Sequence, residues 1–308
     1  MTGEAHDPSG RPGAATAIGE RTGGARAAGA AGTLEGTGLT RVALGPGAFA
    51  YLGEHGMPNA VTVEGRDGVL VIDSLFTPRH ATQLMGLLRA TTDKPVVALV
   101  NTHFHGDHTL GNAAIPTDRV IAHRSVRERL STGGAAYREL LCCVRPDLAP
   151  EIGELEFVLP TELVDDALDL DLGGLSVEIR HAGRHAHTAG DLTVYLPHLD
   201  VLVASDLVFN GILPVARDAD LDGWLAVLAQ LRASFQGAVL VPGHGPIGGP
   251  ELLARQEAVL RTVIDAVSRH RGSRAAARAA ALEEVGSLAH AGERIDAYLD
   301  LILSSEAN

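Results

Sequence analysis

Several short apolar runs in this chain each lead directly into a segment that carries histidine or aspartate. The run "VVALV" leads into "NTH" and ends at His103, "VLVAS" leads into Asp206, and "AVLVP" leads into "GH" and ends at His244. A fourth run, "SVEIRHAG", precedes "RHAHT", which contains His187. Continuous apolar runs are typical of buried strands, and the carboxyl ends of strands in α/β folds share one edge where ligands bind. The sequence therefore predicts four segments whose ends bring histidines and an aspartate to one rim.

The elements between these runs indicate an α/β fold. "TPRHATQLMGLLRAT" predicts a helix that Thr77 caps, with Pro78 in its first turn. "ALDLDLGGLSVEIRHAG" alternates apolar and polar residues around Gly173 and Gly174, which predicts a hairpin. "LDGWLAVLAQLRASF" has helical spacing, and its Trp224 is interpreted as a core residue. The predicted architecture is two sheets covered by helices, a four-layered αββα sandwich with a helical C-terminal tail.

Composition changes along the chain predict three parts. Residues 1–38 are mostly Gly, Ala, Thr and Arg, which bury too little apolar surface to offset chain entropy, so this low-complexity segment is expected to be disordered. Residues 39–249 contain the strand and helix patterns described above and form the predicted catalytic domain. Residues 250–308 are rich in Ala and Arg and predict C-terminal helices.

Charge and hydropathy restrict the partners. A net charge of −13 over 308 residues argues against a nucleic-acid partner, whose phosphates require a basic face. No stretch reaches the ~18 apolar residues of a membrane span, and the N-terminus lacks the basic start and apolar run of a secretory signal. The expected compartment is the cytoplasm. Cys142 and Cys143 are adjacent and are interpreted as helix-borne thiols rather than a disulfide.

The stretch "THFHGDH" at residues 102–108 is the densest group of metal-binding side chains. His103 and His105 alternate, so on an extended chain both rings point to one side and can hold one cation. Asp107 and His108 follow Gly106, where a turn directs them elsewhere, toward a second cation. The candidate ligands of the first ion are completed by His187 and those of the second by His244, with Asp206 as a bridge between the two. Such a set leaves coordination positions open, as in a catalytic metal site.

Three assignments have competing interpretations. His181 and His185 compete with His187, which is preferred because it precedes "TAG". Asp73 ends the strand of "GVLVIDS" at the same rim, and either it orients a metal ligand or it only closes a turn. The arginines of the C-terminal tail either hold an anionic substrate or, as we favour, lie on a solvated helix face; these are Arg255, Arg261, Arg269, Arg271, Arg274 and Arg278.

The motif "THFHGDH", together with "VIDS", "HTAGD", "SDLVF" and "PGHGP", resembles the metallo-β-lactamase superfamily from about Thr40 to Gly249. The chain also resembles, less specifically, the glyoxalase II-like and quinoprotein-associated bacterial hydrolases. The resemblance implies the αββα fold and a binuclear site with seven metal ligands: His103, His105, Asp107, His108, His187, Asp206 and His244.

The resemblance also ranks the possible activities. True β-lactamases of this fold lack the bridging aspartate, so Asp206 argues against β-lactamase activity. The similar acyl-homoserine lactonases have a tyrosine three residues after that aspartate, where this chain has Phe209. Glyoxalase II-like thioesterases share all seven ligands, although their glutathione-binding residues cannot be aligned here. Iron-dependent oxygenases and other redox members use the same ligand set, and a cyclase-like biosynthetic role is a further alternative.

We therefore expect a dinuclear metal-dependent hydrolase of a thioester or another small ester or lactone. The expected cofactors are two divalent ions, zinc first, with iron or manganese as alternatives. A metal-bridging hydroxide would attack the substrate carbonyl, and Asp107 would orient it and relay its proton. By formal count two cations keep a net positive charge after Asp107, Asp206 and hydroxide are subtracted, so the expected partner is a small, anionic substrate.

Overall fold

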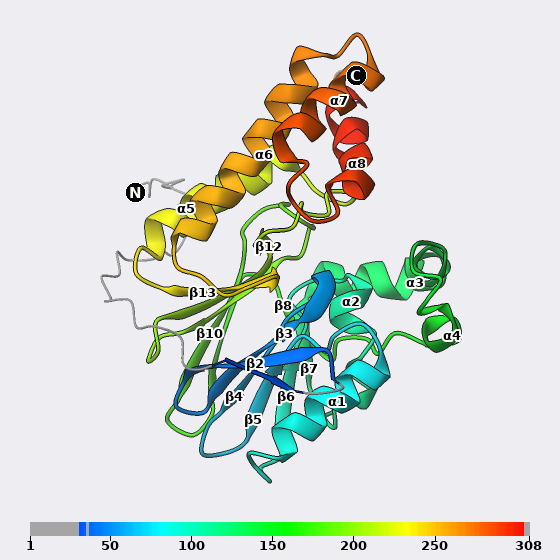
Figure 1. Cartoon of the computed structure of the whole chain (residues 1–308). Coiled ribbons are helices and arrows are strands. Elements are labelled where there is room, and N and C mark those ends of the chain that lie inside the picture. Colours follow the sequence, from blue (N-terminus) through cyan, green and yellow to red (C-terminus); the bar gives the residue numbers. More distant parts are fainter. Residues whose placement is uncertain (1–30, 35–36, 305–308) are drawn as a thin grey trace, which may run out of the picture.

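A computed structural model of the chain describes residues 31–34 and 37–304 and shows two sheets packed face to face (Figure 1). The first sheet has its strands in sequence order. Its first five strands pair antiparallel and its last four pair parallel, so β5 belongs to both runs. The strands are β1 (Ala31–Leu34), β2 (Leu39–Gly45), β3 (Ala48–Gly53), β4 (Ala60–Glu64), β5 (Val69–Ile72), β6 (Val96–Val100), β7 (Val120–His123) and β8 (Glu162–Val164).

The second sheet has the order β13-β12-β11-β10-β9. Only the pair β12–β13 is parallel, and the antiparallel pair β9–β10 is the predicted hairpin. The strands are β9 (Ala167–Asp171), β10 (Ser176–His181), β11 (Leu192–Leu196), β12 (Val201–Phe209) and β13 (Val239–His244). All nine residues of β12 are buried, because one of its faces meets the other sheet and the other face meets helices.

Helices cover both outer faces. They are α1 (Pro78–Arg89), α2 (Gly106–Thr109), α3 (Arg124–Val144), α4 (Ala149–Ile152), α5 (Leu221–Ser234), α6 (Glu251–Arg269), α7 (Arg274–Val285) and α8 (Ala291–Ser304), with short 3-10 turns η1 (Glu54–Gly56) and η2 (Asn112–Ala114). In α1 the Thr77 hydroxyl accepts a hydrogen bond from the backbone N–H of His80, which confirms the predicted cap. None of the helices described, those of residues 37–304, is long and apolar enough to cross a bilayer.

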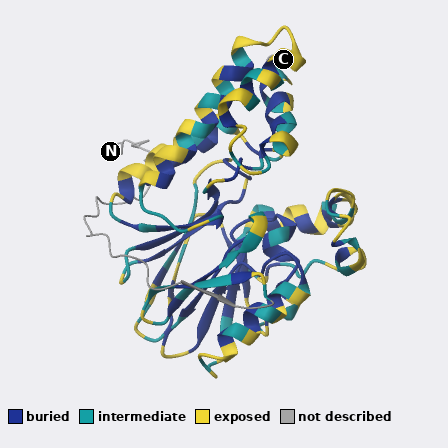
Figure 2. Cartoon of the chain, in the orientation of Figure 1, coloured by how far each residue is buried: buried dark blue, intermediate teal, exposed yellow. Residues whose placement is uncertain are grey.

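Four clusters of buried side chains pack the layers against one another. Figure 2 shows the buried residues concentrated along the two sheets and on the helix faces that cover them. One cluster fills the space between the two sheets. Two others lie between the first sheet and its helices, one under α1 and one under α3 and α4. The fourth joins the second sheet to α5, α6, α7 and α8, and Trp224 is fully buried within it. The predicted four-layered αββα sandwich with C-terminal helices is confirmed.

The predicted disorder of residues 1–38 falls largely outside the described residues. At Ala31–Leu34 the prediction is wrong, because these residues form β1 and pair antiparallel with β2 in the register Ala31 to Val42. Strand pairing uses backbone N–H and C=O groups, which every residue except proline possesses. A segment poor in large apolar side chains can therefore still add an edge strand.

Candidate metal centre

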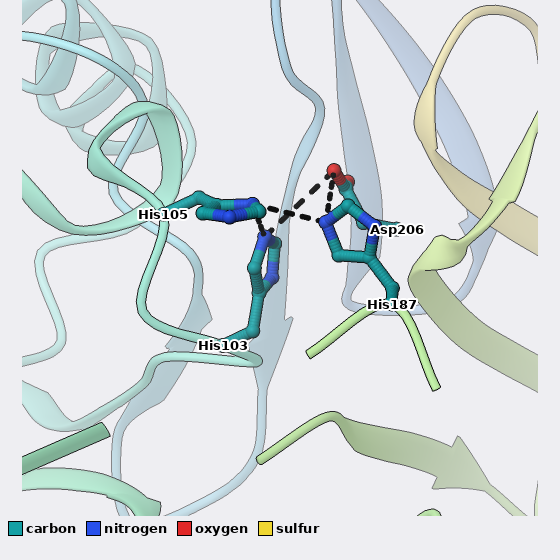
Figure 3. A group of neighbouring side chains, drawn as sticks. All are labelled: His103, His105, His187 and Asp206. Carbon is teal, nitrogen blue, oxygen red and sulfur yellow. Dashed lines mark hydrogen bonds and ion pairs between the residues drawn. The ribbon is translucent and has the colours of Figure 1, made fainter. Parts of the chain in front are cut away.

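The seven candidate ligands come from five places in the fold and meet at one end of the two sheets. His103 and His105 follow β6, Asp107 and His108 lie in α2, and the loop between β10 and β11 carries His187. Asp206 lies within β12 and His244 ends β13. Figure 3 shows that His103 and His105, from the segment after β6, point toward His187 and Asp206, which come from two other segments. The rim predicted from the strand ends is therefore present.

Asp206 is directed into this rim by an irregularity of its strand. The sequence placed Asp206 after a strand, but β12 continues to Phe209 with register shifts on either side of Ser205. Ser205 has a φ of 47°, and irregularities of this kind turn a side chain out of its regular direction. On the neighbouring strand, a Cβ at Gly243 would lie 1.8 Å from the carboxylate of Asp206. Glycine is therefore required at position 243 to leave room for that carboxylate.

The first group of candidate ligands consists of three buried imidazoles. His105 Nδ1 lies 3.1 Å from His103 Nε2 and 2.9 Å from His187 Nε2. Asp206 joins this group, with its Oδ2 3.3 Å from His187 Nε2 and 3.7 Å from His103 Nε2. One ligand atom from each of these four residues lies within 4.8 Å of the others. Four such atoms can surround one cation.

The second group consists of Asp107, His108 and His244. Asp107 Oδ2 lies 3.3 Å from His244 Nε2 and 3.8 Å from His108 Nε2. Asp206 also reaches this group, because its Oδ1 is 3.2 Å from His108 Nε2 and its Oδ2 is 3.5 Å from His244 Nε2. Asp206 thus lies between the two groups, as a bridging carboxylate must.

The outward nitrogens of the rings are held by hydrogen bonds. His108 Nδ1 is 2.8 Å from Asp73 Oδ2, so Asp73 orients a candidate ligand as one of its two interpretations anticipated. His244 Nδ1 is 2.8 Å from the carbonyl of Gly56, and His105 Nε2 is 3.0 Å from Asp218 Oδ2. Such partners fix ring orientation and tautomer, so that the other nitrogen faces the metal.

The hydrogen bonding of two buried atoms indicates whether the site fits metal ions. His108 Nε2 and Asp206 Oδ1 are buried and lie 3.2 Å apart, yet neither makes a hydrogen bond of good geometry, although buried polar atoms ordinarily have a partner. Both are lone-pair donors directed at the centre of the ligand set. His187 Nδ1 also lacks a partner, and its ring instead packs on Trp224 at 5.2 Å between centroids. The residues present fit a pair of cations held by imidazole and carboxylate.

Burial and charge separate the two groups electrostatically. Burial lowers the pKa of His103 well below its usual value and that of His187 to about 3. Burial also opposes the charged form of His108 and His244, but the carboxylate of Asp206 and those beside it outweigh burial. They raise the pKa of His108 well above its usual value and that of His244 to about 9. Without metal His103 and His187 are therefore neutral, whereas His108 and His244 are paired with carboxylates, so cations would replace protons at these two rings.

The structure also decides between the competing histidines. His187 is fully buried in the first group, whereas His185 is exposed and its Nε2 lies 2.6 Å from the carbonyl of Asp218. His181 is turned away and stacks on His123 at 4.1 Å between ring centroids. His187 is therefore the only one of the three that meets the other candidate ligands.

A cavity of about 270 Å³ opens beside the ligands, and His105, Asp107, Asp206 and His244 form part of its lining. The rest of the lining comes from α3, the loop after β12, α8, residues 56–58 and Phe76. Asp107 is the most exposed of the seven candidate ligands, with 26% of its side chain accessible, whereas Asp206 shows 3%. A substrate entering this cavity would therefore meet Asp107 directly.

The sequence analysis did not identify three residues that are far from the ligand motif in sequence but adjacent to the site in the fold. Asp218 lies in the loop before α5 and orients His105, and Tyr137 of α3 accepts a hydrogen bond from the backbone N–H of Gly106 at 3.0 Å. Arg294 of α8 lines the cavity although it was not among the arginines singled out. Of those, Arg261 pairs with Glu257, while Arg274 and Arg278 pair with Asp296 on exposed helix surfaces, in agreement with a solvated face.

Comparison with known proteins adds independent information. The family model described as "Metallo-beta-lactamase superfamily" matches residues 53–244, which contain all seven candidate ligands. A linear primary-alkylsulfatase of Pseudomonas sp. is 28% identical over 240 residues, covering 67% of this chain but only 44% of that protein. A metallo-β-lactamase type 2 of Bacteroides fragilis is 25% identical over 215 residues, covering 66% of this chain and 78% of that protein.

Solved structures show the same fold. A metallo-β-lactamase from Pontibacter korlensis superposes with a TM-score of 0.59 at 22% identity, covering 72% of this chain and 99% of that one. The DIM-1 metallo-β-lactamase superposes with a TM-score of 0.58 at 18% identity, covering 73% of this chain and 97% of that one. Identities this low support the shared architecture alone.

Proposed function

This chain belongs to the metallo-β-lactamase superfamily, and on that premise we propose that it is a dinuclear metal-dependent hydrolase of a thioester or another small ester. Its relatives include hydrolases by name, an alkylsulfatase and several β-lactamases. The chain spans less than half of the alkylsulfatase, so the activity of that whole protein does not transfer with the similarity.

The position of Asp206 is the observation that carries the proposal. Its two carboxylate oxygens lie 3.2–3.7 Å from the ring nitrogens of four histidines, two from each group. A single carboxylate placed between two ligand groups suits a pair of ions that share it. We propose zinc for both positions, because imidazole and carboxylate are ordinary zinc ligands; iron and manganese accept the same set.

Bound divalent cations would supply Lewis acidity and lower the pKa of water at the centre. Within the chain, His103, His105 and His187 would hold one ion, and His105 also lines the cavity through which substrate would approach. Asp73 and Asp218 keep the rings of His108 and His105 turned inward. These residues prepare the centre before substrate arrives, which avoids reorganisation during the reaction.

Asp107 is proposed as the proton-handling residue. Burial would raise its pKa, but His108 and His244 outweigh burial and keep the pKa below its usual value, so the carboxylate is ionised. It lines the cavity and remains partly accessible. An ionised carboxylate there can accept a hydrogen bond from a water molecule, orient that water toward a substrate carbonyl, and receive its proton.

Sulfate-ester hydrolysis is a second candidate, favoured by the similarity to the alkylsulfatase over 67% of this chain. β-Lactam hydrolysis ranks lower. True β-lactamases of this fold lack a bridging aspartate, whereas this chain has Asp206 at that position. An iron-dependent redox reaction would use the same ligand set, and it differs from hydrolysis in consuming oxygen.

A substrate panel on defined metal forms tests the proposal. The purified chain is depleted of metal, reloaded with zinc, iron or manganese, and assayed with a thioester, a carboxylate ester, a lactone, a sulfate ester and nitrocefin, with oxygen uptake recorded in parallel. We expect the zinc form to hydrolyse the thioester or the carboxylate ester most efficiently. Oxygen uptake by the iron form without ester turnover would contradict the hydrolase proposal, and efficient nitrocefin turnover would contradict the ranking of substrates.

A further inference from the structure

The cavity beside the metal centre has two walls of different chemistry. Tyr137, Leu141 and Val144 of α3 give one wall its apolar character, and Phe76 and Met57 extend it. The other wall is formed by α8 and by the loop after β12, which contribute Arg294 and Arg217. A substrate that fills this space would touch mainly hydrocarbon on the α3 side, where the Arg145 guanidinium lies over the Phe76 ring at 5.2 Å from its centroid, and the guanidinium groups of Arg217 and Arg294 elsewhere in the lining.

Arg294 is held in place without being neutralised. Its Nη1 donates a hydrogen bond to the carbonyl of Leu213 at 2.7 Å, and its guanidinium lies over the Phe209 ring at 5.9 Å from the centroid. The described residues offer it no ion pair within 4.0 Å, although guanidinium has five N–H donors and stays charged. Its remaining donors are available to a ligand in the cavity.

The carboxylates near Arg294 have other partners. Asp107 and Asp206 act on it electrostatically, but both belong to the metal-ligand set, so bound cations would take up their charge. Asp218 pairs with His105, and Glu293 pairs with His290 at 3.0 Å. Arg145, the third arginine of the cavity, is already paired with Asp147 at 2.7 Å. Arg294 and Arg217 therefore remain as the cavity arginines without an ion pair among the described residues, and Arg294 is the half-buried one of the two, whereas Arg217 is exposed.

The apolar wall extends to the protein surface. Leu141 is 7% exposed, whereas Val144, one turn along α3, is 48% exposed and lies at the edge of the same cavity. Large apolar side chains exposed to this degree are rare among the described residues, where only Leu140 and Val144 are found. An apolar strip that runs from a buried position to an exposed one suits a hydrocarbon chain that enters from solvent.

Arg294 lies outside the part of the chain shared with the family. The family model ends at residue 244, whereas α8 begins at Ala291. An isolated β-bridge between Ile212 and Ala289 holds the start of α8 beside the loop after β12. The residues matched by the family model therefore do not include this arginine, which α8 adds to the cavity beside the metal centre.

We propose that the substrate is an ester-bearing anionic amphiphile, that Arg294 binds its anionic group, and that Leu141 and Val144 contact its hydrocarbon chain. The proposal rests on the hydrolase function above and specifies its substrate class. Arg294 and Val144 are specificity-determining residues in this account. They contact substrate on opposite walls and leave the reacting bond to the metal centre between them.

Binding of octane-1-sulfonate, an anion with no hydrolysable ester, tests the arginine directly. Calorimetric titration of the zinc-loaded chain is expected to give tighter binding of octane-1-sulfonate than of uncharged octan-1-ol. Arg294→Gln should raise the Kd of the sulfonate by about tenfold or more, since a charge-assisted hydrogen bond is lost, and should change the Kd of octan-1-ol far less. Arg294→Lys should recover part of the sulfonate affinity, and Arg261→Gln on the exposed face of α6 serves as the matched control.

Equal weakening of both probes by Arg294→Gln would show that Arg294 only fixes α8 to Leu213, and would overturn the proposal. Unchanged sulfonate affinity in that variant would overturn it as well. The melting temperature of each variant, measured alongside, separates a lost contact from a lost fold.

A chain-length series tests the apolar wall. From ethane- to octane-1-sulfonate the affinity should increase by about two- to fourfold for each methylene that is buried. Val144→Ser should flatten this dependence, whereas Leu140→Ser, on the same helix but outside the cavity lining, should leave it as in the wild type. A series with no dependence on chain length, or an equal effect of both serine variants, would contradict the assignment of the wall.

These binding measurements do not require turnover. Failure of the substrate panel with intact sulfonate binding would remove the proposed hydrolase function and leave the binding site. Ester turnover with no preference for anionic, long-chain probes would remove this further inference and leave the hydrolase.

Discussion

The two ligand groups of the centre differ in composition and in exposure. His103, His105 and His187 form an all-imidazole group that is buried and backed by Trp224. The second group replaces one imidazole by Asp107, which is partly accessible from the cavity. The first group therefore has the properties of a fixed anchor, and the second those of the side that meets water and substrate. Asp206 connects the two and is the residue on which both depend.

Removal of Asp206 should have the largest effect on both groups. We expect Asp206→Ala to lose at least one equivalent of metal and to reduce kcat/KM by far more than 100-fold, because even an outer partner of a metal ligand is worth about 10–100-fold. Metal analysis and kinetics on the folded variant measure this. Asp222→Ala, an exposed aspartate in the first turn of α5, is the control. An Asp206→Ala variant with two tightly bound metals would mean that the groups do not share this carboxylate.

Single ligand variants should separate the groups. His187→Ala is expected to weaken the metal of the first group, and His244→Ala that of the second, because each removes one of only three or four ligand atoms. Competition with a chromogenic chelator measures the two affinities. His185→Ala should change neither, since that side chain is exposed and lies outside both groups. Loss of metal in His185→Ala with little change in His187→Ala would shift the ligand assignment by two residues.

Removing a carboxylate that hydrogen-bonds a candidate ligand should lower metal affinity by less than removing the ligand itself. Asp218→Ala removes the partner of His105 and should weaken the first metal about 10–100-fold. Asp73→Asn should act chiefly on the second metal through His108, with a smaller effect on the first through Thr102, whose hydroxyl lies 3.1 Å from His103 Nδ1. The same chelator assay applies to both. Equal effects of both variants on the two metals would show that the groups are one coupled unit, so the proposed division would be wrong.

The smallest expected effect is on the pH dependence of stability and comes from His123 and His181, which lie outside both ligand groups. Burial and the neighbouring His181 lower the pKa of His123 to about 4, and neutral His123 accepts a hydrogen bond from the backbone N–H of Ser125 to cap α3. Between pH about 6.5 and 4 the unfolded chain binds a proton there that the folded chain does not, so this contribution to stability is lost as the pH falls.

His123→Gln should therefore reduce the loss of melting temperature on acidification by roughly 1–2 °C, a small amount because the ring is only half-buried. Metal-loaded wild type and variant are compared by thermal unfolding at pH 7 and pH 5. His270→Gln, at the exposed end of α6, should match the wild type. An unchanged or larger acid loss in His123→Gln would contradict the assignment.

The ligands could be predicted because they are encoded locally. "THFHGDH" places four of the candidate ligands within six positions, and short apolar runs lead directly into Asp206 and His244. Arg294 and Asp218 could not be predicted in the same way, because they reach the centre through the packing of α8 and of the loop before α5. Neither has a neighbouring motif that marks it. The edge strand Ala31–Leu34 was missed because backbone pairing leaves little signal in side-chain composition.

Anomalous diffraction at the metal edge tests the central claim most directly. Crystals of the metal-loaded chain are expected to show two anomalous peaks on opposite sides of the Asp206 carboxylate. One should lie among His103, His105 and His187, and the other among Asp107, His108 and His244. A single peak in a fully loaded crystal, or two peaks that do not share Asp206, would contradict the account of a dinuclear centre.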